Sequence, residues 1–369
     1  MTLSFLSASR RTRRTPFSDK VEMCGVSAYT VYNHMLLPTV FKSLEDDYRH
    51  LKNHVQIWDV ACQRQVEISG PDSGKLIRLL TPRDLTQLTP GICFYSPVVD
   101  DKGGMINDPV ILQLDSDKYW ISIGDSDLLL WTKGLAHGLG LEVNITEPEV
   151  FPLAVQGPKS STLAARVFGE TIHNLKFFNY ATYSFEGHNL VVARSGYSKQ
   201  GGFEIYVDDP NIAEPLWQAL FATGQDLNVR AGCPNLIERI EAGLLSYGND
   251  MTQENNPYEC GLKKFCNPEA SPNCVGREAL LKIAAGGPIC EIRSLAIAGD
   301  KLKPCDRIWK VYSKDKLVGK VTSAAWSPDF ETNVAIGMIN VREINNNNVL
   351  EVDTPDGIRV AKAMKTSFI

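Results

Sequence analysis

Apolar residues return along this chain with two spacings, which predict the segments that form helices and those that form strands. From Leu37 to Val55 they recur every three or four positions with charged residues between them, which predicts an amphipathic helix. Short runs that alternate apolar and polar residues, or that are apolar throughout, predict strands. In the first part of the chain the expected strands are 65–68, 92–98, 110–114 and 118–123, with a helix through 76–80 and another that Ser126 caps and that runs to about Leu139.

The same order of elements returns in the next part of the chain. A strand followed by Gly-Pro-x-Ser-x-x-Leu occurs at Gly70 and again at Gly157, which indicates two related α/β modules rather than a short solenoid repeat. The second pass is expected to contain strands at 153–156, 188–193 and 203–207, and helices through 163–167, around 216–221 and over 236–245.

From about residue 287 short alternating segments dominate, separated by Gly, Pro, Asp and Asn. This pattern is typical of a small antiparallel sandwich or barrel. The predicted fold class is therefore α+β, with two related α/β modules at 1–145 and 146–280 and a C-terminal antiparallel β-barrel at 281–369.

Composition narrows the class of protein. The chain has 369 residues, 43% hydrophobic and 22% charged, with a net charge of −5, which argues against nucleic acid or an anionic membrane as the main partner. The sequence shows neither an apolar run long enough to span a membrane nor a signal peptide, so a cytoplasmic protein is expected. Its nine cysteines include no Cys-x-x-Cys, which favours free thiols over a metal site, even for the cluster Cys260, Cys266 and Cys274.

A basic segment, Arg10 to Arg14, stands near the start of the chain. It is interpreted as a solvated arm or as an arm that docks on a partner subunit. The sequence leaves the oligomeric state open, with a homodimer as one expectation.

Asp108 is the first candidate for chemistry. It stands between Gly103-Gly104 and the buried strand 110–114, where a carboxylate costs free energy unless it is paired or used. A turn residue beside Pro109 is the competing interpretation. The chain lacks a P-loop, a His-Glu-x-x-His motif, a Gly-x-Ser-x-Gly elbow and a complete dinucleotide fingerprint, so those enzyme classes are not indicated.

Several stretches, taken in order, resemble the T-protein family of folate-dependent aminomethyltransferases. They are Trp58-Asp59-Val60, Tyr95 to Asp108, Ser195 to Glu204, Asn249 to Tyr258 and Val318 to Pro328, and together they cover nearly the whole chain. The resemblance implies two folate-binding modules and a barrel, arranged as a ring around a central channel that holds tetrahydrofolate as co-substrate. It implies neither a metal nor a flavin.

The resemblance also implies roles for single residues. Asp108 matches the aspartate beside the reacting nitrogen of the pteridine, and its role as base, as orienting group or as a stabiliser of charge stays open. Glu204 matches the glutamate on the amino-pyrimidine edge, and Tyr206 shares its face of a strand. Tyr95 and Ser122 complete the expected folate-binding residues.

The departures from the family pattern indicate a changed partner substrate. The chain has Gln63-Arg64 in place of Met-Gly, Asn107 in place of the first Asp of Asp-Asp, a rebuilt loop 198–202, and no arginine in 234–236. With these departures the chain resembles one branch of the family, and that resemblance implies a methyltransferase that moves a methyl group from the sulfonium of dimethylsulfoniopropionate to N5 of tetrahydrofolate. An aminomethyltransferase, or another folate-linked one-carbon transferase acting on an amine, is the alternative.

A sulfonium is a soft cation that aromatic faces attract at little desolvation cost. Tyr32, Tyr197 and Trp326 are the candidate substrate-binding residues, with a barrel-core position as the competing interpretation of Trp326. Ser122, Lys199 and backbone amides are open alternatives for the substrate carboxylate.

Overall fold

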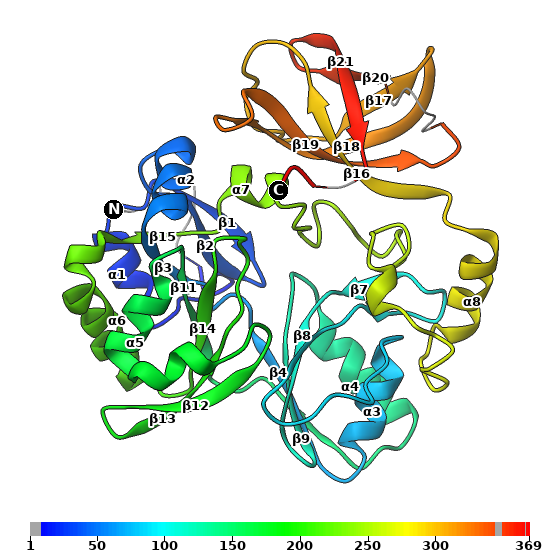
Figure 1. The fold of residues 1–369 in the computed structure, drawn as a ribbon. Coiled ribbons are helices and arrows are strands. Elements are labelled where there is room, and N and C mark those ends of the chain that lie inside the picture. The colour runs from blue at the N-terminus through cyan, green and yellow to red at the C-terminus, as the bar shows by residue number, and fades with distance from the viewer. Residues whose placement is uncertain (1–8, 344–348, 366) are drawn as a thin grey trace.

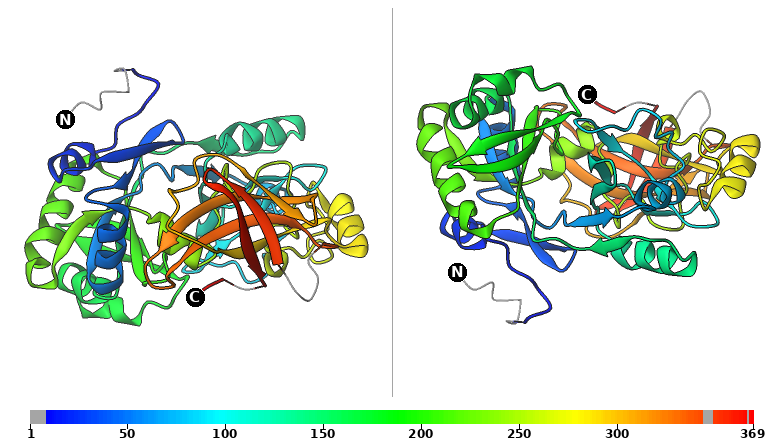
Figure 2. Two further views of the ribbon diagram at one scale, coloured as in Figure 1. Left: turned by 90° about the horizontal axis from the view of Figure 1, so that it is seen from above. Right: turned by 90° about the horizontal axis from the view of Figure 1, so that it is seen from below.

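The computed structural model describes residues 9–343, 349–365 and 367–369 and has three parts. A six-stranded sheet and a five-stranded sheet lie side by side in the lower half of Figure 1, and a closed barrel lies above them. Seen from above, the barrel overlaps mainly the five-stranded part, while α1 (Ser18–Met23) and α6 (Pro210–Thr223) lie at the opposite end of the molecule (Figure 2).

The five-stranded sheet has the order β10-β4-β9-β8-β5, and all its pairs are antiparallel. Helices α3 (Ser73–Leu80) and α4 (Leu128–Gly138) bury apolar side chains such as Leu76 and Leu128 against it. The strands are β4 (Gln65–Ser69), β5 (Cys93–Tyr95), β8 (Val110–Asp115), β9 (Lys118–Ser122) and β10 (Asn144–Thr146), and a separate pair is formed by β6 (Val98–Val99) and β7 (Met105–Asn107).

The six-stranded sheet has the order β12-β13-β14-β11-β3-β15. Its strands are β3 (Val55–Asp59), β11 (Phe151–Gln156), β12 (Tyr180–Phe185), β13 (His188–Ala193), β14 (Gly202–Val207) and β15 (Val229–Gly232). Around it lie α1, α2 (Leu44–Asn53), α5 (Ser160–Phe168), α6, the 3-10 helices η1 (Glu170–Asn174) and η2 (Gln225–Leu227), and the hairpin of β1 (Ala28–Tyr32) and β2 (Met35–Val40).

The two sheets repeat one topology. The order β10-β4-β9-β8-β5 corresponds to β3-β11-β14-β13-β12, and in both sheets the second strand leads through Gly-Pro into a helix. Gly70 and Gly157 stand at these turns with φ of 115° and 120°, and a Cβ would lie 2.9 Å from Glu142 O at the first and 2.3 Å from His54 O at the second. Glycine is required at both positions because of conformation and space. This agreement supports the duplication that the sequence pattern suggested.

The C-terminal part is a closed antiparallel barrel, as the sequence predicted. Its order is β16-β19-β18-β17-β20-β21, with β16 (Cys290–Ile297), β17 (Trp309–Ser313), β18 (Lys316–Ser327), β19 (Thr332–Asn340), β20 (Val349–Thr354) and β21 (Gly357–Met364). Helix α7 (Leu236–Glu241), the 3-10 helix η3 (Lys263–Phe265) and α8 (Arg277–Gly286) precede it. The boundaries at 145 and 280 stay predictions. β3 joins the six-stranded sheet from the first segment, and α8 spans residue 280.

Two predicted helix starts were wrong, each for a physical reason. The helix expected from Leu37 begins only at Leu44, since Pro38 lies in β2 and the Ser43 side chain accepts from Asp46 N as the N-cap. Ser126 does not cap α4, because its hydroxyl donates to Ile106 O instead.

The basic segment is exposed at Arg10, Arg11 and Arg14 and is anchored at Arg13. The backbone N–H of Arg13 donates to His34 O over 2.7 Å, and its guanidinium pairs with Glu147 at 2.6 Å. Arg14 pairs with Asp19 and Glu22 on its own segment. The arm therefore docks on its own chain, beside the tip of the β1–β2 hairpin.

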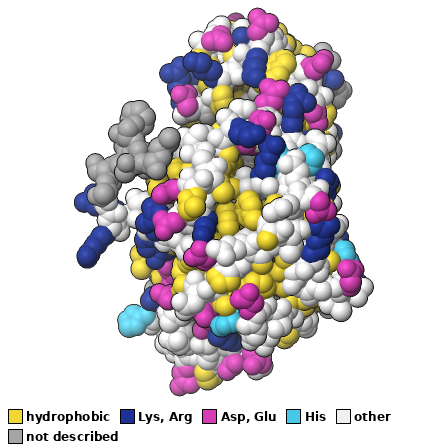
Figure 3. All heavy atoms as spheres, turned by 90° about the vertical axis from the view of Figure 1, so that its left-hand side faces the viewer, with side chains coloured by type: hydrophobic (Ala, Val, Ile, Leu, Met, Phe, Trp, Pro, Cys, Tyr) yellow, Lys and Arg dark blue, Asp and Glu magenta, His cyan; other side chains and the backbone are white. Residues whose placement is uncertain are grey.

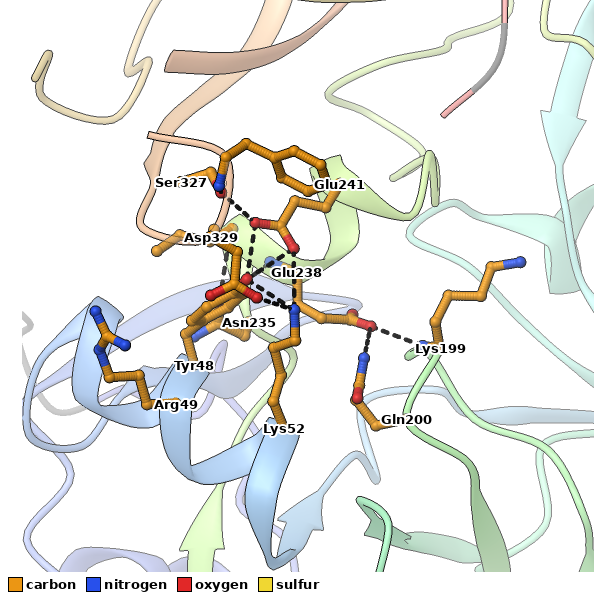
Figure 4. Close-up of polar contacts among 12 residues, drawn as sticks. Tyr48, Arg49, Lys52, Lys199, Gln200, Asn235, Glu238, Glu241, Ser327 and Asp329 are labelled. Carbon is orange, nitrogen blue, oxygen red and sulfur yellow. Dashed lines mark hydrogen bonds and ion pairs between the residues drawn. The ribbon is translucent and has the colours of Figure 1, made fainter. Parts of the chain in front are cut away.

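Polar side chains join the barrel to the six-stranded part (Figure 4). Glu241 of α7 is fully buried and accepts hydrogen bonds from Tyr48 of α2, at 2.9 Å, and from Ser327 of β18. Lys52 of α2 lies 3.8 Å from Glu241 and also pairs with Asp329, so three elements share one network of charges.

The face that carries α1 and α6 shows hydrophobic side chains in its middle, with basic and acidic side chains interspersed around them (Figure 3). Trp217 and Phe221 line a shallow hollow of about 610 Å³ on α6. Among the described residues no helix is both long and apolar enough to cross a membrane.

Candidate active site

Asp108 lies between β7 and β8, at the start of the buried strand that the sequence predicted. The Tyr95 hydroxyl donates to its Oδ2 over 2.8 Å. Burial raises the pKa of the Asp108 carboxyl from 3.8 to about 7, because the hydrogen bond from Tyr95 offsets only part of the desolvation and the negative charge of Asp250 adds to it. Asp108 is thus a half-buried acid that exchanges its proton near neutral pH.

Tyrosines surround this carboxylate. Burial and the nearby charge of Asp108 raise the pKa of Tyr32, Tyr95 and Tyr197, so all three keep their hydroxyl protons at neutral pH. Tyr197 donates to Leu244 O and Leu245 O, at 3.1 and 2.7 Å. The structure therefore brings together four residues that the sequence selected: Asp108, Tyr32, Tyr95 and Tyr197.

Gly124, two residues after the end of β9, lies beside the same carboxylate. A Cβ at this glycine would lie 2.9 Å from Asp108 Oδ1 and 3.5 Å from the Tyr32 hydroxyl oxygen. Glycine at this position therefore leaves the space beside Oδ1 free, which any larger residue would obstruct.

Glu204 forms the centre of a second group. It is buried on β14 and accepts a hydrogen bond from the Ser195 hydroxyl, while burial raises its pKa. Tyr206, two positions along the strand, faces the same way, and its ring lies 5.9 Å from that of Trp120 of the other sheet. Ser122 interacts with the Tyr206 hydroxyl and accepts from Gln65 over 3.0 Å. This group lies where the two sheets meet.

Strand β5 links the two groups. Burial and then the nearby charge of Glu204 raise the pKa of Cys93, while Tyr95 donates to Asp108. Cys93 and Tyr95 are two positions apart and so face the same side of the strand, about 7 Å apart. Both carboxylates therefore adjoin one short stretch of β5.

The remaining two candidates lie on other segments of the chain. Trp326 is half-buried near the end of β18, and the alternation of the strand sets it on the face opposite Ser323 and Ser327, which contact Asp250 and Glu241. The backbone N–H of Lys199 donates to Glu238 over 2.7 Å, and its side chain extends away from Glu238 (Figure 4).

The sequence interpretation missed Tyr247 and the pair of Arg239 and Asp250. Tyr247 donates to Met105 O over 2.8 Å, and burial together with the nearby charge of Asp108 raises its pKa to about 12. Arg239 pairs with Asp250 at 2.8 Å and donates to Ser323 over 2.6 Å, although no arginine stands in 234–236. The charged residues Glu238 and Arg239 between Ile237 and Ile240 were the available signal.

Among the residues that the structure describes, no group of three or more His, Cys, Asp or Glu side chains lies together as a metal would require. The nine cysteines are free thiols. Cys260, Cys266 and Cys274 share one buried apolar cluster, where burial raises the pKa of each thiol.

The chain belongs to the glycine cleavage T-protein family. The GCVT N-terminal domain model matches residues 17–270, and the glycine cleavage T-protein C-terminal barrel domain model matches residues 292–369. This membership agrees with the resemblance that the sequence motifs indicated.

Within the family, one relative is much more similar than several others. The chain is 56% identical over 352 residues to the dimethylsulfoniopropionate demethylase DmdA of Ruegeria pomeroyi, covering 95% of this chain and 96% of that protein. It is 26% identical to an aminomethyltransferase of Desulforamulus reducens, over 89% of this chain and 90% of that protein. The chain is therefore a close homologue of the demethylase and a distant one of the aminomethyltransferase.

The fold also matches a solved structure, the glycine cleavage system aminomethyltransferase T of Bartonella henselae. The TM-score is 0.87 at 20% identity, over 97% of this chain and 98% of that one. This likeness shows the fold: a mixed α+β protein with a C-terminal six-stranded antiparallel barrel.

Proposed function

We propose that this chain demethylates dimethylsulfoniopropionate by transferring one methyl group from the sulfonium to N5 of tetrahydrofolate. The products are methylmercaptopropionate and 5-methyltetrahydrofolate. The observation that carries the proposal is the similarity, over nearly the whole chain, to the Ruegeria pomeroyi demethylase. The carboxylates of Glu204 and Asp108, which both adjoin β5, support the proposal. The first suits the polar edge of a folate ring, and the second suits its reacting nitrogen.

The three parts form a ring whose central channel holds the folate, with folate-binding modules at 1–145 and 146–280 and the barrel at 281–369. The meeting of the two sheets around Glu204 and Tyr206 supports this arrangement. Glu204 binds the amino-pyrimidine edge, since a carboxylate accepts well from adjacent N–H donors. Tyr206 and Ser122 lie beside that carboxylate and bound the ring.

Asp108 lies beside N5 and acts on the charge that develops there. The attacking amine becomes cationic as it takes the methyl group and must later lose a proton. An ionised Asp108 stabilises that charge, and with a pKa of about 7 it is able to accept the proton. Tyr95 keeps the carboxylate oriented through its hydrogen bond to Oδ2.

The sulfonium needs alignment rather than activation, because its leaving group is a neutral thioether. Tyr32 and Tyr197 remain uncharged at neutral pH and present aromatic faces to the cation beside Asp108. Exclusion of water strengthens these interactions and holds the donor in line with the acceptor. Trp326 stays a prediction as a further aromatic contact.

The proposal is tested by anaerobic incubation of the purified chain with tetrahydrofolate and dimethylsulfoniopropionate that carries deuterated S-methyl groups. Mass spectrometry of the folate pool should find 5-methyltetrahydrofolate with all three deuterons, and methylmercaptopropionate in equal amount. The retained deuterons distinguish direct displacement from a route through a methylene group. If folate binds but stays unmethylated, the sulfonium donor is wrong, and amine donors become the next substrates to test.

A further inference from the structure

Asn107 precedes Asp108 and makes an unusual set of contacts. It is fully buried at the end of β7, and its side-chain amide binds the backbone of Gly124 in both directions. Oδ1 accepts from Gly124 N over 2.8 Å, while Nδ2 donates to Gly124 O over 3.0 Å and to Ser126 Oγ over 2.7 Å. The orientation of the amide is fixed by these partners, because Gly124 N can only donate.

A second buried asparagine binds the same glycine from another element. Asn33 is the first residue of the turn between β1 and β2, and its Nδ2 donates to Gly124 O and to Cys62 O, each over 3.0 Å. Its backbone N–H donates to Asp125 Oδ1 over 2.8 Å. With φ of 48°, Asn33 adopts the left-handed conformation that asparagine tolerates better than most residues. The hairpin that carries Tyr32 is thus fastened to Gly124 by one side chain.

These contacts lead to the reaction centre. A side chain on Gly124 would meet both Asp108 Oδ1 and the Tyr32 hydroxyl, so the position of this backbone sets the space that the two groups share. We propose that Asn33 and Asn107 are positioning residues that together hold Gly124 between Asp108 and Tyr32, and that the neutral amide at 107 keeps a second carboxylate from standing directly beside Asp108.

The choice of amide over carboxylate at position 107 follows from the hydrogen bonds. Aspartate there would keep the acceptor for Gly124 N but lose both donors, and it would turn an oxygen toward the carbonyl of Gly124. It would also add negative charge beside a carboxyl whose neighbours already include Asp250. The other titratable groups that face Asp108 are Tyr32, Tyr95, Tyr197, Tyr247 and Cys260.

The proposal rests on the proposed function for its kinetic test, which compares the pH dependence of methyl transfer in Asn107→Asp, Asn107→Ala and the unchanged chain. The kcat of both variants should fall by about 10-fold or more, because the Gly124 backbone beside Asp108 is displaced. The acid limb of the profile should move up by about one pH unit in Asn107→Asp and stay in place in Asn107→Ala, since only the first adds a like charge. An unmoved limb and an unchanged kcat in Asn107→Asp would overturn the role of Asn107.

Asn333→Asp is the matched control. Asn333 is equally buried in the barrel, and its amide also accepts from one backbone N–H, that of Leu302, and donates to backbone carbonyls, among them Asp300 O. This variant should lower the melting temperature and leave kcat and the acid limb as they are. An equal shift in both variants would show that the effect of Asn107 is only structural.

Asn33→Gly tests the other half of the proposal. Glycine keeps the left-handed turn and removes the amide that fastens the hairpin. The KM for the sulfonium substrate should rise by about 10-fold as Tyr32 loses its position. Unchanged KM and kcat would show that Asn33 has no positioning role.

A readout without turnover separates the two proposals. The titration of Asp108 can be followed by NMR of the ¹³C-labelled carboxyl carbon, with the resonance assigned by its absence in Asp108→Asn. The midpoint should rise by about one pH unit in Asn107→Asp and not in Asn333→Asp. If the unchanged chain transfers no methyl group, the proposed function fails, and this midpoint still decides whether Asn107 sets the environment of Asp108.

Discussion

The Tyr95 hydroxyl donates a hydrogen bond of 2.8 Å to the Asp108 carboxylate at the centre of the candidate site. Burial favours the protonated form of Asp108, whereas this bond favours the ionised form. The result is a pKa of about 7, at which the carboxyl is half ionised under neutral conditions. Small changes in either effect therefore alter the protonation state of Asp108.

Tyr95→Phe should raise the pKa of Asp108 above about 7, because the opposing hydrogen bond is lost while the burial remains. The acid limb of kcat against pH should move up by about one unit, with activity recovered at higher pH. Tyr247→Phe is the control, since it removes a tyrosine hydroxyl that donates to Met105 O rather than to Asp108. A limb that moves equally in both variants would contradict the role of the Tyr95 bond.

Asp108→Asn should slow methyl transfer by about 100-fold or more, while the Kd for tetrahydrofolate changes far less. Single-turnover rates and anaerobic folate titrations measure the two effects separately. A variant with unchanged turnover would remove Asp108 from the mechanism.

The same substitution should raise stability, and the sign follows from the pKa. The folded chain holds the Asp108 proton more tightly than the unfolded chain, because the pKa is about 7 instead of 3.8. The free energy of unfolding therefore falls as pH rises from about 4 to about 7 and is constant above that range. Asp108→Asn removes this loss. Its free energy of unfolding should therefore exceed that of the unchanged chain by at most about 4 kcal/mol at pH 8 and by almost nothing at pH 4. Urea unfolding at the two pH values checks this; an equal gain at both would refute it.

Most of the fold could be predicted from the sequence, and the site only in part. The strands 110–114 and 203–207 carry dense apolar runs, so local pattern identified them, and the motifs placed Asp108 and Glu204 on or beside them. Strand β3 was hidden because its residues continue the apolar spacing of the preceding helix, and only pairing with β11 and β15 defines it. Ser126 looked like a helix cap, but its hydroxyl bonds to the backbone of Ile106, which no local signal reveals.

Long-range pairing explains the residues that were missed. Arg239 acts with Asp250, and no feature of either segment shows that the loop after α7 returns its aspartate to that helix. Asn107 likewise looks like a simple departure from a family pattern until its amide is seen on Gly124, which follows another strand.

Glu204→Gln should weaken tetrahydrofolate binding by about 10- to 100-fold, because an amide replaces one carboxylate oxygen with a donor that faces the N–H groups of the ligand. Ser195→Ala should weaken binding less, since it removes only the hydroxyl that donates to Glu204. Anaerobic calorimetric titration measures both.

Glu241→Gln is the matched control for these variants. Glu241 is also a buried glutamate that accepts from hydroxyl groups, those of Tyr48 and Ser327, at the junction with the barrel (Figure 4). This variant should lower the melting temperature and leave the folate affinity unchanged. If Glu204→Gln lowers only the melting temperature, Glu204 is a structural residue and does not bind folate.

The pair of Arg239 and Asp250 should hold the barrel against α7 only while both charges are present. Their side chains are 8% and 0% exposed, so removing one leaves the other buried without its opposite charge. Asp250→Asn and Arg239→Met should each reduce the free energy of unfolding by about 3–5 kcal/mol, and the double variant by less than the sum. Urea unfolding of the four proteins gives the coupling energy.

The exposed pair of Arg49 and Glu45, 3.0 Å apart on α2, is the control and should show coupling below about 1 kcal/mol. Equal coupling in both pairs would mean that burial does not set the strength of the inner pair, and that the barrel is held mainly by its apolar contacts with α7.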